Sequence, residues 1–322
     1  MQRNRRTFLK YLFAGTGTAV AGASWWAAVS KQRAARWIRR LAGDARREVR
    51  PAPLRPNPAA WSDKQITLSW LGHSTVLLNF YGLHILTDPV LGSRVGISAG
   101  IGTIGPKRYV APALGARELP PIDIVLLSHA HYDHLDVPTL RRLPASTFAV
   151  TAKATRDILS GTRLKEITEL GWGERARFKG RNGELEVEAI EVKHWGQRWP
   201  SEVARGYNGY IFRREGVSLL FGGDTALTPA FEQARSRGPF ALAIMPIGAY
   251  RPWIYNHCTP EQAVQMANIA GARYLVPVHH QTFRLSDEPA NEPIERLQAA
   301  LQHEPERLAL QQIGATFVCP TA

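Results

Sequence analysis

Apolar residues occur along the chain in short runs separated by glycine, proline and polar turns, which predicts many short strands and a few helices. From Ile66 onward three such runs, divided by Gly72 and by Tyr81-Gly82, predict a β-meander. Strands are expected over 66–71, 76–80 and 85–88, with a second set over 184–192, 209–213, 218–221, 242–246 and 274–278. Helices are expected over 138–143, 153–160, 229–236 and 260–270. Two halves that each run from strands to helices favour an α/β sandwich of two sheets flanked by helices.

A further run, 122–127, is apolar apart from Asp123 and is followed directly by a dense cluster of polar residues. This run is typical of a buried strand that delivers the loop after it to a sheet edge. The loop reads Ser128-His129-Ala130-His131-Tyr132-Asp133-His134. Imidazole and carboxylate groups at this density suit a cation such as zinc, because crowding them together costs stability unless a cation neutralises and orients them. The sequence therefore predicts a metal site in this loop.

Composition and charge limit the other interpretations. With 322 residues, 44% hydrophobic and 21% charged, the chain can build a large core, and we expect one main domain over 59–322. The net charge of +13 is uneven, since residues 1–56 carry +11 and only +2 remains for the rest. A nucleic-acid-binding body is therefore excluded. Two cysteines, Cys258 and Cys319, rule out a disulfide framework, and their spacing leaves their pairing open.

Residues 1–30 resemble a twin-arginine export signal. Arg5-Arg6 precedes a mildly apolar stretch, 11–29, whose Gly, Thr and Ala content makes it less hydrophobic than a spanning helix. The alternative is an uncleaved membrane anchor. Either segment would place the body in the periplasm or at the outer face of the cytoplasmic membrane.

The export hypothesis makes a direct prediction about the arginine pair. Changing Arg5→Lys together with Arg6→Lys is expected to leave the protein in the cytoplasm, because the signal depends on both guanidinium groups. Cell fractionation measures the outcome. An unchanged distribution would favour the simple anchor.

Residues 31–58 form a second N-terminal segment. Arginines alternate with apolar residues at helical spacing over 31–50, and Trp37 lies among them, which predicts a basic amphipathic helix. Such a helix could contact a membrane surface through arginine and phosphate groups. A helix packed on the body and a solvated linker are the alternatives. Four prolines, from Pro51 to Pro58, end the helix and predict a linker to the main domain.

The histidine cluster also carries a resemblance to a known family. His129-x-His131-x-Asp133-His134 resembles the H-x-H-x-D-H signature of metallo-β-lactamase-fold hydrolases, which implies an αββα sandwich. Further motifs are similar to the branch of phospholipases D that hydrolyse N-acylphosphatidylethanolamine. They are Trp70-Leu71-Gly72-His73-Ser74, Thr87-Asp88-Pro89, Gly105-Pro106-Lys107-Arg108, His194-Trp195, Gly223-Asp224-Thr225, Pro246-Ile247-Gly248-Ala249-Tyr250 and His279-x-x-Thr282-Phe283.

The resemblance implies a role for each matching residue. One metal would be held by His129, His131 and His194, the other by Asp133, His134 and His279, with Asp224 bridging both. His73 and Asp88 are expected to orient ligands rather than bind metal, and Tyr250 to lie near the substrate. His257 is a candidate to orient or protonate the leaving group, although it could be an ordinary loop histidine. His280 stands where the branch usually has an aromatic residue, and on extended backbone it would point away from His279.

Two divalent cations in such a site, zinc or alternatively manganese or iron, would acidify a bridging water and supply hydroxide as the nucleophile, with Asp133 in the catalytic centre. The leading hypothesis is a phosphodiesterase that releases N-acylethanolamine-like products from a phospholipid. A lactonase or other small-ester hydrolase is the alternative, because one scaffold hosts many reactions. A non-catalytic metal-binding envelope protein is the third hypothesis. The sequence leaves the substrate and the oligomeric state open.

Overall fold

The structure is a computed structural model that describes residues 43–44, 46–98, 102–199 and 204–320. The chain divides into two compact units, Met1–Arg47 and Glu48–Ala322, and the second contains the fold. The expected signal or anchor, and most of the expected basic helix, lie outside the described residues. Within the described ranges, every helix is too short or too polar to cross a bilayer.

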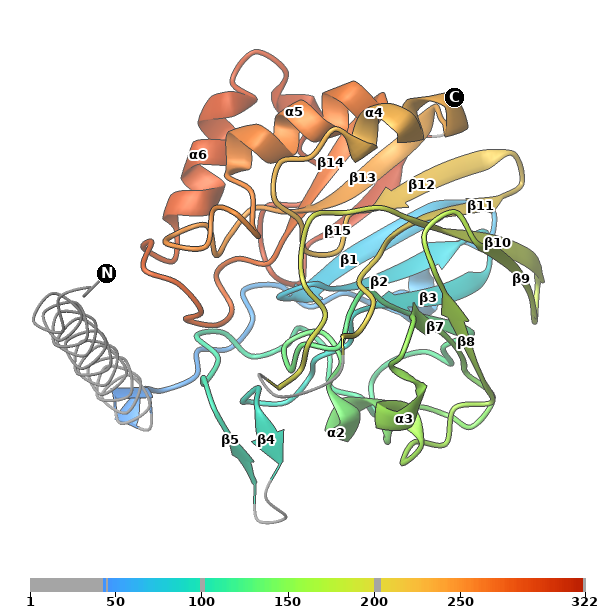
Figure 1. Ribbon diagram of the computed structural model, residues 1–322, viewed down its shortest axis with the longest axis horizontal. Coiled ribbons are helices and arrows are strands. Elements are labelled where there is room, and N and C mark those ends of the chain that lie inside the picture. The colour runs from blue at the N-terminus through green and yellow to red at the C-terminus, as the bar shows by residue number, and fades with distance from the viewer. Residues whose placement is uncertain (1–42, 45, 99–101, 200–203, 321–322) are drawn as a thin grey trace, which may run out of the picture. The chain divides into compact units, whose positions relative to one another are not determined.

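Two sheets make up the body of the fold, and the first contains seven strands. Its order is β15-β1-β2-β3-β6-β7-β8 (Figure 1). The strands are β1 (Ile66–Gly72), β2 (Thr75–Phe80), β3 (Leu83–Thr87), β6 (Ile124–Leu127), β7 (Phe148–Ala152), β8 (Glu166–Leu170) and β15 (Thr316–Cys319). The expected meander is present, because β1, β2 and β3 pair antiparallel in sequence order. From β3 onward the pairing is parallel.

The second sheet has six strands in the order β14-β13-β12-β11-β10-β9. They are β9 (Arg175–Gly180), β10 (Gly183–Ile190), β11 (Gly209–Arg214), β12 (Val217–Phe221), β13 (Phe240–Pro246) and β14 (Ala272–Val278). A separate two-stranded hairpin consists of β4 (Ile97–Ser98) and β5 (Thr103–Ile104).

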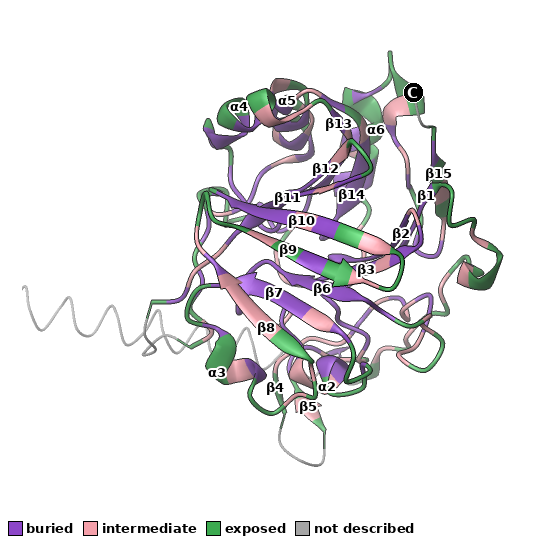
Figure 2. Ribbon diagram, turned by 90° about the vertical axis from the view of Figure 1, so that its right-hand side faces the viewer, coloured by how far each residue is buried: buried purple, intermediate pink, exposed green. Residues whose placement is uncertain are grey.

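Helices cover both outer faces of the stacked sheets, as Figure 2 shows. They are α2 (Val137–Leu140), α3 (Arg156–Leu159), α4 (Ala230–Ala234), α5 (Pro260–Ala270) and α6 (Glu292–Ala300), with 3-10 turns at Pro58–Ala60, Arg235–Arg237 and Pro305–Arg307. The helices α4, α5 and α6 lie on the second sheet, and α2 and α3 lie beside the first. The αββα sandwich expected from the sequence is thereby confirmed.

Two apolar cores hold these layers together. Between the sheets, Phe80 of β2 meets Phe212 of β11 with ring centroids 6.1 Å apart, among fully buried aliphatic residues. The second core lies between the six-stranded sheet and α4 to α6 and includes Phe231 and Met266. Because burial of apolar surface is the dominant stabilising term, both faces of the second sheet are fixed in place. The loops that leave its strands therefore start from rigid positions.

The structure differs from the sequence-based prediction in two places and answers one question that the sequence left open. The helices expected over 138–143 and 153–160 shrink to the single turns α2 and α3. The proline-rich stretch expected as a linker packs along the body: Arg50 N–H donates to the Tyr109 carbonyl (3.0 Å), and Leu54 N–H to that of Ile313 (3.3 Å). Cys258 and Cys319 are both buried and free, so they do not pair.

Candidate metal centre

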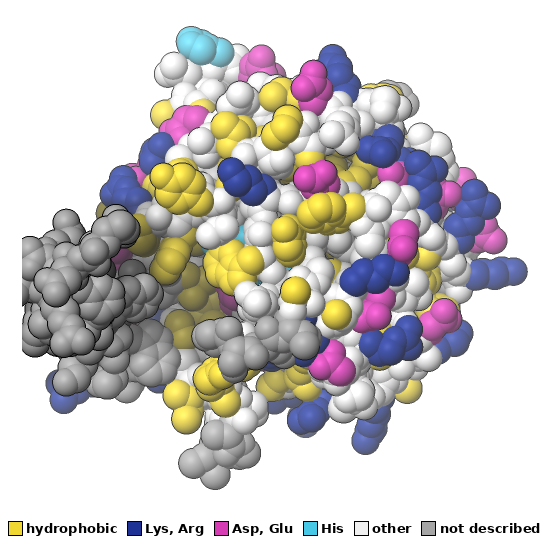
Figure 3. Space-filling model, viewed as in Figure 1, with side chains coloured by type: hydrophobic (Ala, Val, Ile, Leu, Met, Phe, Trp, Pro, Cys, Tyr) yellow, Lys and Arg dark blue, Asp and Glu magenta, His cyan; other side chains and the backbone are white. Residues whose placement is uncertain are grey.

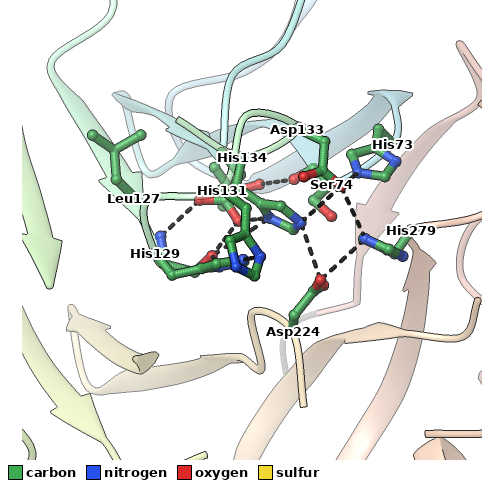
Figure 4. Close-up of polar contacts among 12 residues, drawn as sticks. His73, Ser74, Leu127, His129, His131, Asp133, His134, Asp224 and His279 are labelled. Carbon is green, nitrogen blue, oxygen red and sulfur yellow. Dashed lines mark hydrogen bonds and ion pairs between the residues drawn. The ribbon is translucent and has the colours of Figure 1, made fainter. Parts of the chain in front are cut away.

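The candidate site lies where loops from both sheets meet (Figure 4). The cluster from His129 to His134 follows β6, His194 follows β10, and Asp224 follows β12. His279 comes directly after β14, and His257 lies in the loop between β13 and α5. Since β12, β13 and β14 run parallel, their carboxyl ends reach the same edge, which brings residues far apart in sequence together.

Three histidines form the first set of donors. The Nε2 atom of His129 lies 2.7 Å from Nδ1 of His131, and Nε2 of His194 lies 3.3 Å from the same Nδ1. His129 and His194 are buried, and His131 is partly exposed. Three imidazole nitrogens that converge in this way match the ligand type and number of a histidine-rich zinc site.

The second set combines carboxylates with histidines. The Oδ2 atom of Asp224 lies 3.2 Å from Nε2 of His134 and 3.1 Å from Nε2 of His279. The Oδ2 atom of Asp133 lies 3.4 Å from Nε2 of His279. Asp224 Oδ2 is also 3.8 Å from Nε2 of His194, so this carboxylate lies between the two sets. The predicted bridging position of Asp224 is consistent with this geometry.

The outward-facing nitrogens of the histidines are held by neighbours. The Nδ1–H of His134 donates to Oδ2 of Asp88 (2.6 Å), and the Nδ1–H of His194 donates to the Asn256 carbonyl (2.9 Å). Ser128 Oγ contacts Nδ1 of His129 at 2.8 Å. With the protons assigned to Nδ1, the Nε2 lone pairs of these rings face the site, as metal ligation requires.

Burial and mutual charge set the ionisation of the cluster. Burial lowers the pKa of His131 to about 4 and that of His194 to about 3, and it also holds the pKa of His129 well below its usual range. Burial opposes charge on His279 too, yet Asp224 and Asp133 raise its pKa to about 9. Burial likewise opposes the charge of Asp224, but His134 and His279 keep its pKa well below its usual range. The first set is therefore neutral and the carboxylates are ionised.

These donors fit a pair of cations. The Nε2 atom of His131 and the Oδ1 atom of Asp224 are buried and have no hydrogen-bond partner. Unpaired buried polar atoms are costly, and a cation in contact with them removes the cost. Two sets of donors share the same loop edge, and within each set the ligand atoms lie within 4.8 Å of one another: His129, His131 and His194 in one, and His73, Asp133, His134 and His279 in the other.

His73 and His279 lie next to each other, and both have an uncommon backbone conformation. Both have left-handed φ, 52° at His73 and 64° at His279, which is uncommon for residues other than glycine. His279 N–H donates to the His73 carbonyl (3.0 Å), and His73 N–H donates to Thr282 Oγ1 (2.7 Å). The expectation of extended backbone at His279 was thus wrong, because β14 ends at Val278. His279 nevertheless faces the cluster.

The other expected site residues lie at different distances from the donors. His73 Nε2 contacts Oδ2 of Asp133 at 2.9 Å, which orients that carboxylate. His257 is buried, and its Nδ1 lies 3.7 Å from Oδ2 of Asp224. His280 stacks on Trp70 with centroids 4.4 Å apart, so it packs as an aromatic ring. Tyr250, expected near the substrate, donates its hydroxyl to Glu292 of α6 (2.8 Å).

The sequence is similar to proteins of a known superfamily. The sequence matches the β-lactamase superfamily domain over residues 84–280. The chain belongs to the metallo-β-lactamase superfamily. An uncharacterised protein of Mycobacterium tuberculosis is 37% identical over 270 residues, which are 81% of this chain and 71% of the relative.

Two relatives are named for a phospholipase D activity. The N-acyl-phosphatidylethanolamine-hydrolyzing phospholipase D 1 of Caenorhabditis elegans is 31% identical over 69% of this chain and 65% of its own length. The mitochondrial N-acyl-phosphatidylethanolamine-hydrolyzing phospholipase D of Saccharomyces cerevisiae is 30% identical over 71% of this chain, but only 50% of the yeast protein. The chain is therefore a metal-dependent hydrolase of the superfamily, near this phospholipase D branch.

Solved structures agree on the fold. An isothiocyanate hydrolase from Delia radicum gut bacteria gives a TM-score of 0.61 at 18% identity and covers 79% of this chain and 100% of its own. The metallo hydrolase Igni18 of Ignicoccus hospitalis gives 0.58 at 19% identity, over 80% of this chain and 100% of its own. At such identities the likeness extends to the superfamily fold alone.

Sequence reasoning missed several supports of this superfamily site. Ser128 donates its N–H to Oδ1 of Asp88 (2.7 Å) and its hydroxyl to Oδ2 (2.6 Å), and Asn256 supports His194 through its backbone carbonyl. Ser128 stands directly before the signature, which was a usable signal. Asn256 acts through its backbone carbonyl, a group that every residue has, so its residue type could not predict this contact.

Asp88 is expected to be the most sensitive of these supports. Asp88→Ala removes the carboxylate that fixes the His134 ring and leaves the buried Ser128 N–H unpaired. Loss of a group that orients a metal ligand typically weakens metal affinity by about 10-fold to 100-fold. Competition with a chromophoric chelator measures the effect. Metal affinity equal to that of the unaltered protein would contradict the role given to Asp88.

Proposed function

We propose that the protein is a binuclear phosphodiesterase of the phospholipase D type, acting on N-acylphosphatidylethanolamine-like lipids. The observation that carries the proposal is the position of Asp224, whose Oδ2 lies within 4 Å of histidines from both donor sets. A carboxylate between two donor sets is the arrangement that two-metal phosphoester hydrolases use. The names of the nematode and yeast relatives supply the substrate class.

The donor sets would hold two divalent ions, zinc or alternatively manganese or iron. His129, His131 and His194 would hold one ion, and Asp133, His134 and His279 the other, with Asp224 shared. When bound, such ions polarise a phosphoryl or carbonyl oxygen and make a nearby water more acidic. The chain itself keeps the donors oriented, since His73 holds Asp133 and Asp88 holds His134.

His257 is the residue we propose to act on the leaving group. Its ring is buried beside the donors, 5.0 Å from the His194 ring and 5.2 Å from the His279 ring. Burial lowers the pKa of His257 to about 3, so the ring is neutral near pH 7. A neutral imidazole has one N–H to donate and is a weak proton donor. We therefore propose that His257 orients the leaving oxygen by a hydrogen bond.

A substrate panel on the metal-loaded full chain tests this function. The panel contains vesicles of N-acylphosphatidylethanolamine, a soluble nitrophenyl phosphodiester and a simple lactone. We expect release of N-acylethanolamine together with phosphatidic acid, and slower turnover of the soluble diester. Brisk lactone hydrolysis without phospholipid turnover would sink the lipid proposal in favour of a lactonase. A loaded protein that is inert on all three substrates would point to a binding protein.

The location of the enzyme is part of the same proposal. Residues 1–30 would export the chain to the periplasm or the outer face of the cytoplasmic membrane, where a phospholipid substrate is at hand. The basic residues over 31–50 would add electrostatic attraction to anionic headgroups, worth about 1 kcal/mol for each arginine near the surface. Salt is expected to weaken this attraction.

Two truncations separate attraction from folding. A chain that starts at Glu48 is expected to keep hydrolysis of a soluble phosphodiester but to lose much of its rate on anionic vesicles. A chain that starts at Ala59 is expected to melt at a lower temperature, because it loses the pairing of Arg50 with Tyr109 and Ala111 and the Leu54 bond to Ile313. Thermal melts and paired rate measurements report both effects. Equal loss on both substrates for the Glu48 chain would mean that residues 31–47 are structural.

A further inference from the structure

Exposed apolar side chains gather around the candidate metal centre. Eleven large hydrophobic residues are exposed among the described ranges, and six of them belong to the three loops that carry His194, Asp224 and His257. We name these six the apolar rim: Trp195, Trp199, Leu227, Trp253, Ile254 and Tyr255. Figure 3 looks onto a face of the body where hydrophobic side chains gather, with a histidine visible between them. Such clustering marks an interaction surface rather than chance exposure.

Contacts tie the rim to the donors beneath it. The Trp195 ring lies 4.5 Å from the ring of His131 and 4.3 Å from that of His194. The Trp253 carbonyl accepts hydrogen bonds from the N–H groups of Asn256 (2.8 Å) and His257 (2.9 Å). Asn256 in turn accepts from His194 Nδ1. The turn that exposes Trp253, Ile254 and Tyr255 therefore also fixes two histidines of the centre.

The stretches that hold the rim residues contain cations, whereas the carboxylates of the same loops, Glu191, Glu202 and Asp224, lie outside these stretches. Residues 193–199, 225–230 and 247–258 contain the cations Lys193, Arg198 and Arg251 and no aspartate or glutamate. Lys193 is exposed, Arg251 pairs with Glu292 of α6, and Arg198 lies over the Tyr132 ring. Tryptophan and tyrosine beside cations, without carboxylates, are the composition found where proteins meet phospholipid headgroups.

We propose that the apolar rim is the surface with which the enzyme docks on a phospholipid bilayer, and that the 251–257 turn links docking to the metal centre. The donors lie below the rim, with Asp224 2% and His257 6% exposed. Entry of the rim side chains into the headgroup layer would bring the phosphodiester of a membrane lipid toward these donors. This inference rests on the proposed lipid substrate, but docking can be measured without turnover.

Vesicle flotation of the full chain tests the docking surface. The double variant Ile254→Ser/Tyr255→Ser removes two exposed rim side chains, and Val318→Ser removes a comparably exposed residue of β15, 47% exposed, as the control. Vesicles contain phosphatidylcholine with phosphatidylglycerol. High salt, which shortens the Debye length to about 3 Å at 1 M, suppresses the attraction of residues 31–50. Metal content and thermal melts verify that each variant is intact.

At high salt the partition constant of the double variant is expected to fall about tenfold or more, with the control unchanged, because the rim contribution comes from apolar burial. Replacing Tyr255 by tryptophan in the Ile254→Ser background is expected to restore part of the lost partition, since tryptophan also favours the interface. Partition that is equal for the double variant and the unaltered chain would overturn the proposal, as would an equal fall in Val318→Ser. A shift from dimer to monomer in sedimentation, with vesicle binding intact, would assign the rim to contact between copies.

The two proposals fail in different ways. A protein that partitions through its rim but hydrolyses only soluble lactones would keep the docking surface and lose the phospholipase function. Phospholipid turnover by a protein whose vesicle partition does not depend on the rim residues would support the phospholipase function and overturn the docking surface.

Discussion

Replacing Asp224 and His131 together by alanine is expected to abolish turnover while the fold survives. Asp224 Oδ2 is the shared neighbour of His134, His279 and His194. His131 Nδ1 lies beside Nε2 of both His129 and His194. Asp224→Ala alone is expected to lower the rate on the order of a thousandfold or more, because it removes a charge from both donor sets. The two cores do not include these side chains, so secondary structure is expected to persist.

Elemental analysis, circular dichroism and rate measurements check this result together. The unaltered chain is expected to hold about two metal ions, as a two-metal centre requires. The double variant should hold fewer ions with an unchanged far-ultraviolet spectrum. Glu295→Gln, an exposed carboxylate on α6, is the matched control and should alter none of the three readings. Full activity in the double variant would refute the metal mechanism.

Local patterns in the sequence account for the elements that were predicted well. The helix expected over 260–270 has those bounds in the structure, because Thr259 and Gln262 form a capping box and Gly271 ends the helix in a left-handed conformation. The strands of the meander and, apart from β9, those of the second sheet also lie within a few residues of their expected positions. In each case the signals that begin and end the element are adjacent in sequence.

Edge strands were missed for a physical reason. β8 and β9 lie at the ends of their sheets and carry charged, largely exposed residues such as Glu166, Arg175 and Lys179. The pattern of such residues predicts a polar loop, because the segment becomes extended only when it pairs with a neighbouring strand. Helix α6 and strand β15 were likewise absent from the prediction.

The candidate site could also be predicted only in part. His129 to His134 could be recognised because four donors share one loop, and the family resemblance supplied His194, Asp224 and His279. The contact of Asp88 with His134 spans 46 residues, and the left-handed turn at His279 depends on the His73 carbonyl. Neither leaves a local trace, since the first is set by the parallel pairing of β3 with β6 and the second by how the first sheet meets the second. The rim residues were also missed, because exposure cannot be read from residue type.

Removal of the metal ions is expected to lower the melting temperature sharply without unfolding the protein at room temperature. Each site contributes about 2.7 kcal/mol when free metal exceeds its dissociation constant a hundredfold. For the body Glu48–Ala322 the loss of two sites corresponds to a fall of about 10 °C. The ion pairs of His279 and His134 with Asp224 remain in the metal-free cluster, so its donors stay partly satisfied.

Differential scanning calorimetry with and without a chelator measures this fall, and addition of zinc should reverse it. Asp224→Ala serves as the internal control: it has lost the shared carboxylate, so the chelator should shift its melting temperature much less than that of the unaltered chain. The comparison isolates metal linkage from any direct effect of the chelator on the fold. If the chelator leaves the melting temperature of the unaltered chain in place while activity disappears, the ions are bound too weakly to stabilise the body. If both temperature and activity are unaffected, the convergence of these histidines and carboxylates serves some purpose other than holding metal.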